Sequence, residues 1–452
     1  MEAIRNRNEQ RARANYFVHS YGCKQNVADC ERIRGILELL GFKQGTSTEK
    51  SDIIIYNTCG VRRTATDRVL GNIGALKKLK IKNPELIIGV CGCMVEQEGV
   101  ADYLARRFPF VDLIFGTNLI HHLPRFLYEV SFGARKIRET KLDDGIVEGL
   151  PISREAGVVG LVPITYGCDN FCSYCVVPYV RGRERSREPE VILNEIRDLV
   201  AQGYKEITLL GQNVNSYGKG LACKVNFAEL LAKIDSLPGR FRVRFLTSHP
   251  KDCSKELIDT IAGSEKICKQ IHLPVQSGSD DVLRLMNRGY TREQYLDLVR
   301  YLKEKIPGVS LGSDIIVGFP GEGEREFLQT LSLVKEIKFN LLFTFVYSPR
   351  KGTRAADMPD ATPKEEKKAW LGRLLKEQEL ISDEQNAKQC GKVKVVLPER
   401  FTETAGKSVL LGKCGNGFLV EFEGERGLIG EFVEVKIVGA TRRSLVGERM
   451  TK

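Results

Sequence analysis

The chain has 452 residues, too many for one ordinary hydrophobic core, so two to four domains are expected. Neither an apolar leader nor an apolar run of membrane-spanning length is visible, so a cytoplasmic protein is predicted, and in that reducing compartment 13 cysteines favour metal or redox ligands over disulfides. The 69 lysines and arginines exceed the 58 aspartates and glutamates, and the net charge of +11 suits either an RNA-binding protein or a generally basic enzyme.

The first region begins after residues 1–14, which we predict to be a flexible N-terminus. Between 15 and 135, β-branched apolar runs alternate with amphipathic stretches, a pattern typical of parallel βαβ units. The predicted strands are 15–23, 52–60, 86–93 and 111–117. We therefore expect an open parallel α/β sheet, followed at 136–154 by a charged, aperiodic linker.

The second region, 155–383, repeats a strand followed by a helix. Its strand-like runs are 160–167, 206–213, 242–250, 270–278, 309–321 and 341–349. Six such units are fewer than a complete barrel needs, so the sequence predicts a partial (β/α)6 barrel. The active site of such a barrel lies at the carboxyl ends of its strands.

The last region, 386–450, begins at the end of a Lys/Glu/Leu-rich helix at 364–389 and changes to short alternating strands with glycine turns. This pattern predicts a small five-stranded β-barrel, an architecture that often binds oligonucleotides. A purely structural cap is the alternative. The whole chain is thus predicted to be α/β with a small all-β domain at its C-terminal end.

A cysteine triplet in the stretch "YGCDNFCSYC" ends the first predicted barrel strand. Cys168, Cys172 and Cys175 are three ligands, whereas structural zinc requires four, and no other histidine or cysteine follows nearby. A 4Fe–4S cluster held by three thiolates leaves one iron open to a substrate or cofactor. We therefore predict a catalytic cluster here, with zinc or buried structural cysteines as the alternatives.

A second set of cysteines follows three different strands of the first region. Cys23, Cys59 and Cys93 each stand just past a predicted strand, and the carboxyl ends of parallel strands meet at one edge of a sheet. Helix N-termini, which begin directly after them, favour anionic sulfur. A second three-ligand cluster is predicted, with scattered buried cysteines as the alternative; Cys91 is expected on the opposite face.

The CxxxCxxC spacing, with Tyr174 before the last cysteine, resembles the radical S-adenosylmethionine enzymes. Stretches such as "NTCGVR", "GCMVEQEG" and "YSPRKGTRAADMP" extend the likeness over nearly the whole chain to the methylthiotransferase family, with an N-terminal methylthiotransferase domain, a radical core and a C-terminal TRAM domain. "LLGQNVNSYG" and "TSHP" are most similar to the bacterial branch that makes 2-methylthio-N6-dimethylallyladenosine in tRNA. The alternatives are the branches acting on threonylcarbamoyl-adenosine or on a ribosomal-protein aspartate, and a non-catalytic iron–sulfur RNA-binding protein.

This resemblance implies two 4Fe–4S clusters and two molecules of S-adenosylmethionine. One cluster, on Cys168, Cys172 and Cys175, cleaves the cofactor to a radical; the auxiliary cluster, on Cys23, Cys59 and Cys93, carries the sulfur to be methylated and delivered. Candidate cofactor contacts at the strand ends are Gly211, Gln212, Asn213, Gln276, Ser277, Asp314 and Gly318. The alternative for each is an ordinary turn residue. The usual Gly-Gly-Glu motif is missing at 211–213, so the cofactor's amino group must be held differently.

The implied substrate is the anticodon loop of tRNA, which presents an unstacked base. Candidate RNA-binding residues, with a solvated charge run as the alternative, are Arg181, Arg183, Arg185, Arg187, Arg350, Arg442 and Arg443. Phe345 and Tyr347 suit either base stacking or core packing. We also expect a monomer that is served by an electron donor such as flavodoxin or ferredoxin and by sulfur or iron–sulfur supply proteins.

Overall fold

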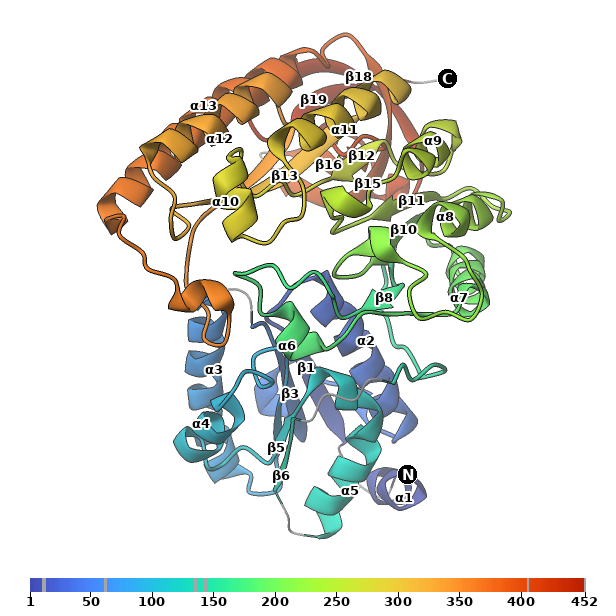
Figure 1. Cartoon of the computed structure of the whole chain (residues 1–452). Helices are drawn as coiled ribbons and strands as arrows, with labels where there is room; N and C mark the ends of the chain where they lie inside the picture. Colours follow the sequence, from blue (N-terminus) through green and yellow to red (C-terminus); the bar gives the residue numbers. More distant parts are fainter. Residues whose placement is uncertain (10–13, 61–62, 134–135, 141–144, 405, 451–452) are drawn as a thin grey trace.

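The computed structural model describes the chain except residues 10–13, 61–62, 134–135, 141–144, 405 and 451–452 (Figure 1). It contains an N-terminal sheet, a partial barrel and a closed C-terminal β-barrel, as the sequence predicts. In Figure 1 the N-terminal sheet lies below the barrel, with helix α6 (Val177–Arg181) between them. No helix in the described part of the chain combines the length and the apolar character needed to cross a membrane.

The N-terminal domain is an open sheet of parallel strands in the order β2-β1-β3-β4-β5-β6. The strands are β1 (Asn15–Ser20), β2 (Lys43–Gln44), β3 (Ile53–Thr58), β4 (Ile87–Gly92), β5 (Leu113–Phe115) and β6 (Ile137–Glu139). The helices are α2 (Lys24–Leu39), α3 (Arg63–Lys82), α4 (Val100–Arg107) and α5 (Leu123–Phe132). One hydrophobic core lies under α2 and α5 and another under α3 and α4, because alternate residues of each strand point to opposite faces.

Two predictions about the borders of this domain are wrong. Residues Glu2–Glu9 form helix α1 instead of a flexible N-terminus, because Ile4 enters the core under α5 and Asn8 donates a hydrogen bond to the carbonyl of Leu40. The linker does not begin at 136, because β6 pairs with β5 and buries Ile137. Residues 141–144 of the predicted linker lie outside the described part of the chain.

The central domain has the predicted strands as two parallel groups, β7-β10-β11 and β12-β13-β14, joined by a bridge between Val243 and Ile267. The strands are β7 (Val159–Pro163), β10 (Glu206–Leu210), β11 (Arg242–Phe245), β12 (Gln270–His272), β13 (Ser310–Val317) and β14 (Leu341–Val346). The helices are α7 (Pro189–Ala201), α8 (Phe227–Asp235), α9 (Lys255–Gly263), α10 (Asp280–Leu285), α11 (Arg292–Lys305), α12 (Glu324–Ile337) and α13 (Lys364–Ala387). The outward strand faces and the helices share the largest hydrophobic core.

The inner face of the first half of the barrel is covered by the N-terminal domain. Ala28 of α2 packs against Leu161 of β7 and Leu210 of β10. The two domains are thus fastened together by apolar packing, and the N-terminal end of α2, where Cys23 lies, is brought to the barrel.

The C-terminal domain is a closed barrel in the order β15-β16-β17-β19-β18. Its strands are β15 (Val393–Thr404), β16 (Lys407–Cys414), β17 (Leu419–Glu423), β18 (Val433–Ala440) and β19 (Leu445–Arg449). It docks on the central domain, where Arg242 Nη1 donates to the carbonyl of Lys413 at 2.9 Å and Arg244 Nη2 to that of Cys414 at 3.3 Å. The fold therefore agrees with the predicted α/β architecture and terminal TRAM-like barrel.

Candidate active site

The cysteine triplet lies on the loop that follows β7 and the short strand β8 (Thr165–Tyr166), at the carboxyl end of the barrel. Gly167 begins the loop with φ +73°, and a Cβ there would stand 2.0 Å from the carbonyl oxygen of Arg183. Only glycine tolerates this turn, which directs Cys168 away from the strand. Cys168 and Cys172 are buried.

Other elements hold this loop in place. The Ser173 hydroxyl donates to the carbonyl of Leu285 at 2.7 Å, and its backbone N–H donates to that of Met286. Arg288 is buried, and its Nη1 donates to Cys172 Sγ at 3.4 Å while Nη2 donates to the carbonyl of Pro274 at 2.7 Å. A guanidinium aimed at sulfur stabilises a thiolate, so this site is built for an anionic ligand set.

The chemistry of the triplet fits an iron–sulfur cluster. Burial raises the pKa of the Cys168 thiol to about 11, so a free thiol would keep its proton at neutral pH, whereas a metal ligand loses it on coordination. Among the described residues, no group of three or more His, Cys, Asp or Glu side chains is arranged around a single metal ion. A cubane meets each thiolate through a different iron, so its ligands need not converge in that way.

The second set of cysteines follows adjacent strands, as predicted. Thr58 and Gly92 are paired in the β3–β4 register, so Cys59 and Cys93 come directly after neighbouring strand ends. Gly92 has φ +101°, a left-handed turn that lets the Cys93 N–H donate to the carbonyl of Thr58 at 3.0 Å. Cys23 is the N-cap residue of α2. Burial, with a further contribution from the charge of Cys23, raises the pKa of the Cys93 thiol to about 11. Cys91 packs in the core on the α2 side, away from this edge.

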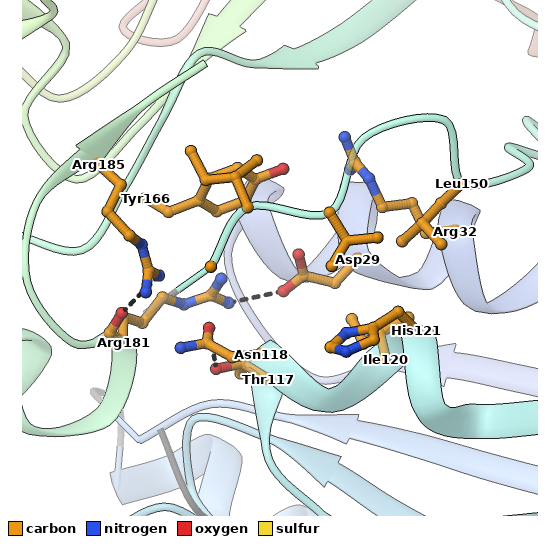
Figure 2. Close-up of a pocket in the computed structure, with 13 residues that line it drawn as sticks. Asp29, Arg32, Thr117, Asn118, Ile120, His121, Leu150, Tyr166, Arg181 and Arg185 are labelled. Atoms are coloured by element: carbon orange, nitrogen blue, oxygen red, sulfur yellow. Dashed lines mark hydrogen bonds and ion pairs between the residues drawn. The ribbon is translucent and has the colours of Figure 1, made fainter. Parts of the chain in front are cut away.

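Helix α6 connects the two cysteine sets. It starts just after Cys175 and ends at Arg181, so its five residues span about 8 Å. Arg181 Nε donates to Cys93 Sγ at 3.1 Å. Its Nη2 pairs with Asp29 Oδ2 at 2.8 Å, as Figure 2 shows. Arg181 also lines a cavity of about 60 Å³ together with Asp29, Arg32 and Arg185. The two cysteine sets therefore lie on either side of one short helix.

The predicted cofactor contacts have different fates. Gln212 and Asn213 stand at the end of β10, where Gly211 leaves room for the Thr165 hydroxyl, which a Cβ would approach to 2.1 Å. Gln276 has φ +74°, a strained conformation of the kind found at functional sites. Asp314 Oδ1 lies 3.3 Å from His272 Nε2, inside the barrel.

Two of those predictions are not supported by the geometry. The Ser277 hydroxyl is completely buried and lies 3.2 Å from the Thr330 hydroxyl of α12, so it does not face the cysteine loop. The sequence predicts that Gly318 lets a ligand approach the backbone. The Lys367 side chain instead fills the space where a Cβ of residue 318 would be, and the backbone N–H of Gly318 donates to the Glu322 carboxylate.

Of the buried polar atoms that lack a hydrogen-bond partner among the described residues, one group lies in the segments that follow β7, β10 and β11. These atoms are Thr165 Oγ1, Glu184 Oε1, Gln212 Oε1, Asn213 Oδ1, both amide atoms of Asn215, Ser248 Oγ and His249 Nε2. Buried polar atoms are nearly always paired, so this group indicates a polar ligand. S-adenosylmethionine carries amino, carboxylate and ribose groups that match such donors and acceptors.

Three residues near the cysteine loop were not predicted from the sequence: Glu184, His249 and Arg288. Glu184 follows the cysteine loop in the sequence and lies near Cys168, and its charge raises the pKa of the Cys168 thiol. Lys219 Nζ lies 3.3 Å from Glu184 Oε2. Glu184 therefore places a buried carboxylate close to the cysteine loop. Burial lowers the pKa of His249 to about 2, so its imidazole is neutral. Arg288 contacts Cys172, but nothing in its sequence neighbourhood signals this role.

The predicted RNA-binding arginines divide by burial. Arg181 and Arg187 are wrong as phosphate contacts, because Arg181 is bound to Asp29 and Cys93, and Arg187 is bound to Glu148 and Glu195. Arg183 is exposed and pairs with Asp169 at 2.7 Å. Arg185 and Arg350 are half-buried, Arg442 pairs with Glu379 of α13 at 3.2 Å, and Arg443 is exposed.

Comparison with known proteins identifies the family. Residues 162–334 match the Radical SAM superfamily, and residues 15–116 match Uncharacterized protein family UPF0004. The tRNA-2-methylthio-N(6)-dimethylallyladenosine synthase of Clostridium botulinum (strain Okra / Type B1) is 49% identical over 453 residues and 100% of both chains. That of Carboxydothermus hydrogenoformans is 51% identical, over 94% of this chain and 97% of the relative. The chain belongs to this family.

As a tRNA-2-methylthio-N(6)-dimethylallyladenosine synthase family member, the chain is a radical SAM methylthiotransferase, which confirms the resemblance read from the sequence. The radical SAM domain implies a 4Fe–4S cluster and S-adenosylmethionine as cofactors. The radical S-adenosylmethionine methyltransferase TsrM from Kitasatospora setae has a similar fold, with a TM-score of 0.55 at 16% identity over 76% of this chain and 74% of that one. The cobalamin-dependent radical enzyme OxsB gives 0.51 at 14% identity over 82% and 56%.

Proposed function

We propose that this protein adds a methylthio group to carbon 2 of N6-dimethylallyladenosine beside the tRNA anticodon, using two S-adenosylmethionine molecules and two 4Fe–4S clusters. The curated relatives that match the full chain carry the name of this synthase. The observation that carries the proposal is the position of Arg181, which ends the helix after Cys175 and donates to Cys93. One short helix thus separates the predicted radical site from the predicted sulfur-carrying site.

The residues of the chain prepare these sites in distinct ways. Cys168, Cys172 and Cys175 would hold the radical cluster, which supplies one-electron chemistry suited to a carbon–hydrogen bond without an acidic proton. Arg288 orients Cys172, and the carboxylate of Glu184 would take the positive amino group of S-adenosylmethionine.

At the auxiliary site Cys93 is buried by a different set of contacts, whereas Cys23 is exposed. Cys93 packs with Val176 and Val180 in a small apolar cluster, and Arg181 neutralises sulfur charge while Asp29 fixes the guanidinium. Cys23 and Cys59 would complete this ligand set.

The remaining assignments are proposals of the same kind. Arg183 and Arg443, which are exposed, are candidates for phosphate contacts, together with Arg185, Arg350 and Arg442. We propose a cytoplasmic monomer that receives electrons from a flavodoxin or ferredoxin and its sulfur from iron–sulfur supply proteins.

The test is incubation of the anaerobically reconstituted protein with S-adenosylmethionine, a reductant and tRNA from a strain that lacks the modification. Mass spectrometry of the digested tRNA should detect the added methylthio group, and the Cys168→Ala variant should not produce it. Ribosomal protein offered in parallel tests the aspartate-modifying alternative. Binding of tRNA with no methylthio product and no 5′-deoxyadenosine would refute the proposal and favour a non-catalytic RNA-binding protein.

A further inference from the structure

The second half of the barrel presents an apolar face to its own interior. On β14, Leu342 packs outward in the core shared with the helices, so the alternate residues Leu341, Phe343 and Phe345 point inward. Their exposed fractions are 43%, 46% and 46%. Large apolar side chains on the inner face of a barrel are normally buried, so this exposed face indicates a binding surface.

The first half of the barrel has such a cover and the second does not. Ala28 of α2 contacts the inner residues Leu161 and Leu210. Among the described residues, no element buries Phe343 and Phe345 in the same way. The barrel interior is therefore divided into a half that is filled by the chain and a half with an open apolar wall.

This wall is continuous with the cysteine loop. Ile316 pairs with Phe345 in the β13–β14 register, so both side chains point inward, and Ile316 packs in one cluster with Tyr174. Tyr174 stands between Cys172 and Cys175 in the sequence. A group lying on this wall is thus next to the predicted radical site.

The wall also carries one polar pair. The His272 ring contacts the Phe343 ring edge-on at a centroid distance of 5.8 Å, and His272 Nε2 lies 3.3 Å from Asp314 Oδ1. A group of buried polar atoms without partners lies at the ends of β7, β10 and β11, in the other half, whereas the segments that follow β12, β13 and β14 contribute one such atom each, from Ser279, Glu322 and Tyr347. The polar half therefore suits the polar cofactor, and the apolar half suits a largely hydrocarbon ligand.

We propose that Leu341, Phe343 and Phe345 form the subsite for the dimethylallyl group of the substrate adenine, so that β14 sets the preference for prenylated over unmodified RNA. This inference rests on the proposed function. Dimethylallyl is a branched five-carbon chain without hydrogen-bonding groups, and it gains binding free energy only by leaving water against apolar surface. Aromatic rings provide that surface, and His272 and Asp314 would face the polar edge of the base.

The experiment compares two anticodon stem-loop RNAs that differ only in carrying N6-dimethylallyladenosine or adenosine at the modified position. Their dissociation constants are measured by fluorescence anisotropy with the reconstituted full chain. The wild-type protein should bind the prenylated RNA on the order of tenfold more tightly. Phe343→Ala and Phe345→Ala should each reduce that ratio severalfold while the affinity for the unmodified RNA stays within about twofold. Phe343→Leu, which keeps an apolar side chain, should retain most of the ratio.

The matched control is Leu328→Ala, which removes a similarly exposed apolar side chain from the outer helix α12 and should leave the ratio unchanged. A wild-type ratio near one, or an unchanged ratio in both alanine variants, overturns the inference. So does a variant that loses S-adenosylmethionine affinity or changes its oligomeric state at an unchanged ratio, since the face would then serve the cofactor or a second copy. Failure of the proposed function is separate, because it appears as wild-type protein that makes no methylthio product.

Discussion

The buried ion cluster under the C-terminal barrel allows a quantitative prediction. Glu206 on β10 is 2% exposed and accepts hydrogen bonds from Arg242 Nε at 2.7 Å and from Arg244 Nε at 3.3 Å. The same arginines donate to the carbonyls of Lys413 and Cys414. Replacing Glu206 by glutamine leaves two buried guanidinium groups without their carboxylate. Both the β10–β11 region of the central domain and the docking of the C-terminal domain should therefore weaken.

Two independent arguments give a similar loss of unfolding free energy for Glu206→Gln. Burial disfavours the charged carboxylate, but Arg244 and Arg242 outweigh it and lower the pKa of Glu206 from 4.5 to about 2. That change corresponds to about 3 kcal/mol of stability at neutral pH. Loss of one partner from a buried ion cluster typically costs about 3–5 kcal/mol. We therefore expect the free energy of unfolding to fall by about 3 kcal/mol.

The pH dependence has a definite sign. A carboxyl whose folded pKa is depressed stabilises the fold fully above its unfolded pKa, here 4.5, and loses that effect as the pH falls toward 2. The difference between wild type and Glu206→Gln should therefore be constant from pH 7 to about pH 5 and should shrink below about 4.5.

The assay is urea unfolding followed by circular dichroism, with hydrogen exchange of residues 407–414 as a local reading of C-terminal docking. Glu190→Gln, at a carboxylate that is 71% exposed, is the control and should change the unfolding free energy by less than about 0.5 kcal/mol. If Glu206→Gln stays within that same margin and residues 407–414 exchange no faster, the energetic argument is refuted.

Three further predictions concern the clusters and their ligands. Cys59→Ala should lower the iron content from about eight to about four per chain, whereas the exposed-cysteine control Cys223→Ala should keep it, and eight irons in Cys59→Ala would contradict the auxiliary site. Glu184→Gln should weaken S-adenosylmethionine binding roughly tenfold in equilibrium dialysis at unchanged iron content; an unchanged dissociation constant would remove Glu184 from the site. Arg181→Met should lower the melting temperature, whereas Arg183→Met should lower only RNA affinity and its salt dependence; equal effects of the two would contradict their different burial.

Sequence patterns predicted the strands because their signals are local. The apolar runs around Ile53–Thr58 and Ser310–Val317 are read from a few consecutive residues, and both became strands. The placement of Cys59 and Cys93 together also followed from one rule, the meeting of parallel strand ends, once two neighbouring strands were recognised.

Side chains of the arginine run show where this reasoning stops. Arg181, Arg183 and Arg187 alternate in one short segment, yet two are buried against carboxylates and one is exposed. Their partners Asp29 and Glu148 are distant in the sequence, so no local pattern distinguishes a structural arginine from one that meets solvent. The same holds for Arg288, whose contact with Cys172 spans 116 positions.

The sequence by itself determined the kind of chemistry, because the identity and spacing of Cys168, Cys172 and Cys175 are covalent properties, and its local patterns predicted two parallel α/β domains and a small β-barrel. Only the tertiary structure decided how those parts face one another. It placed α6 between the cysteine sets and Glu184 among the partnerless polar atoms, and it left Phe343 uncovered inside the barrel. These outcomes depend on how the domains pack, because the burial of apolar surface between them determines which charged and aromatic side chains become neighbours.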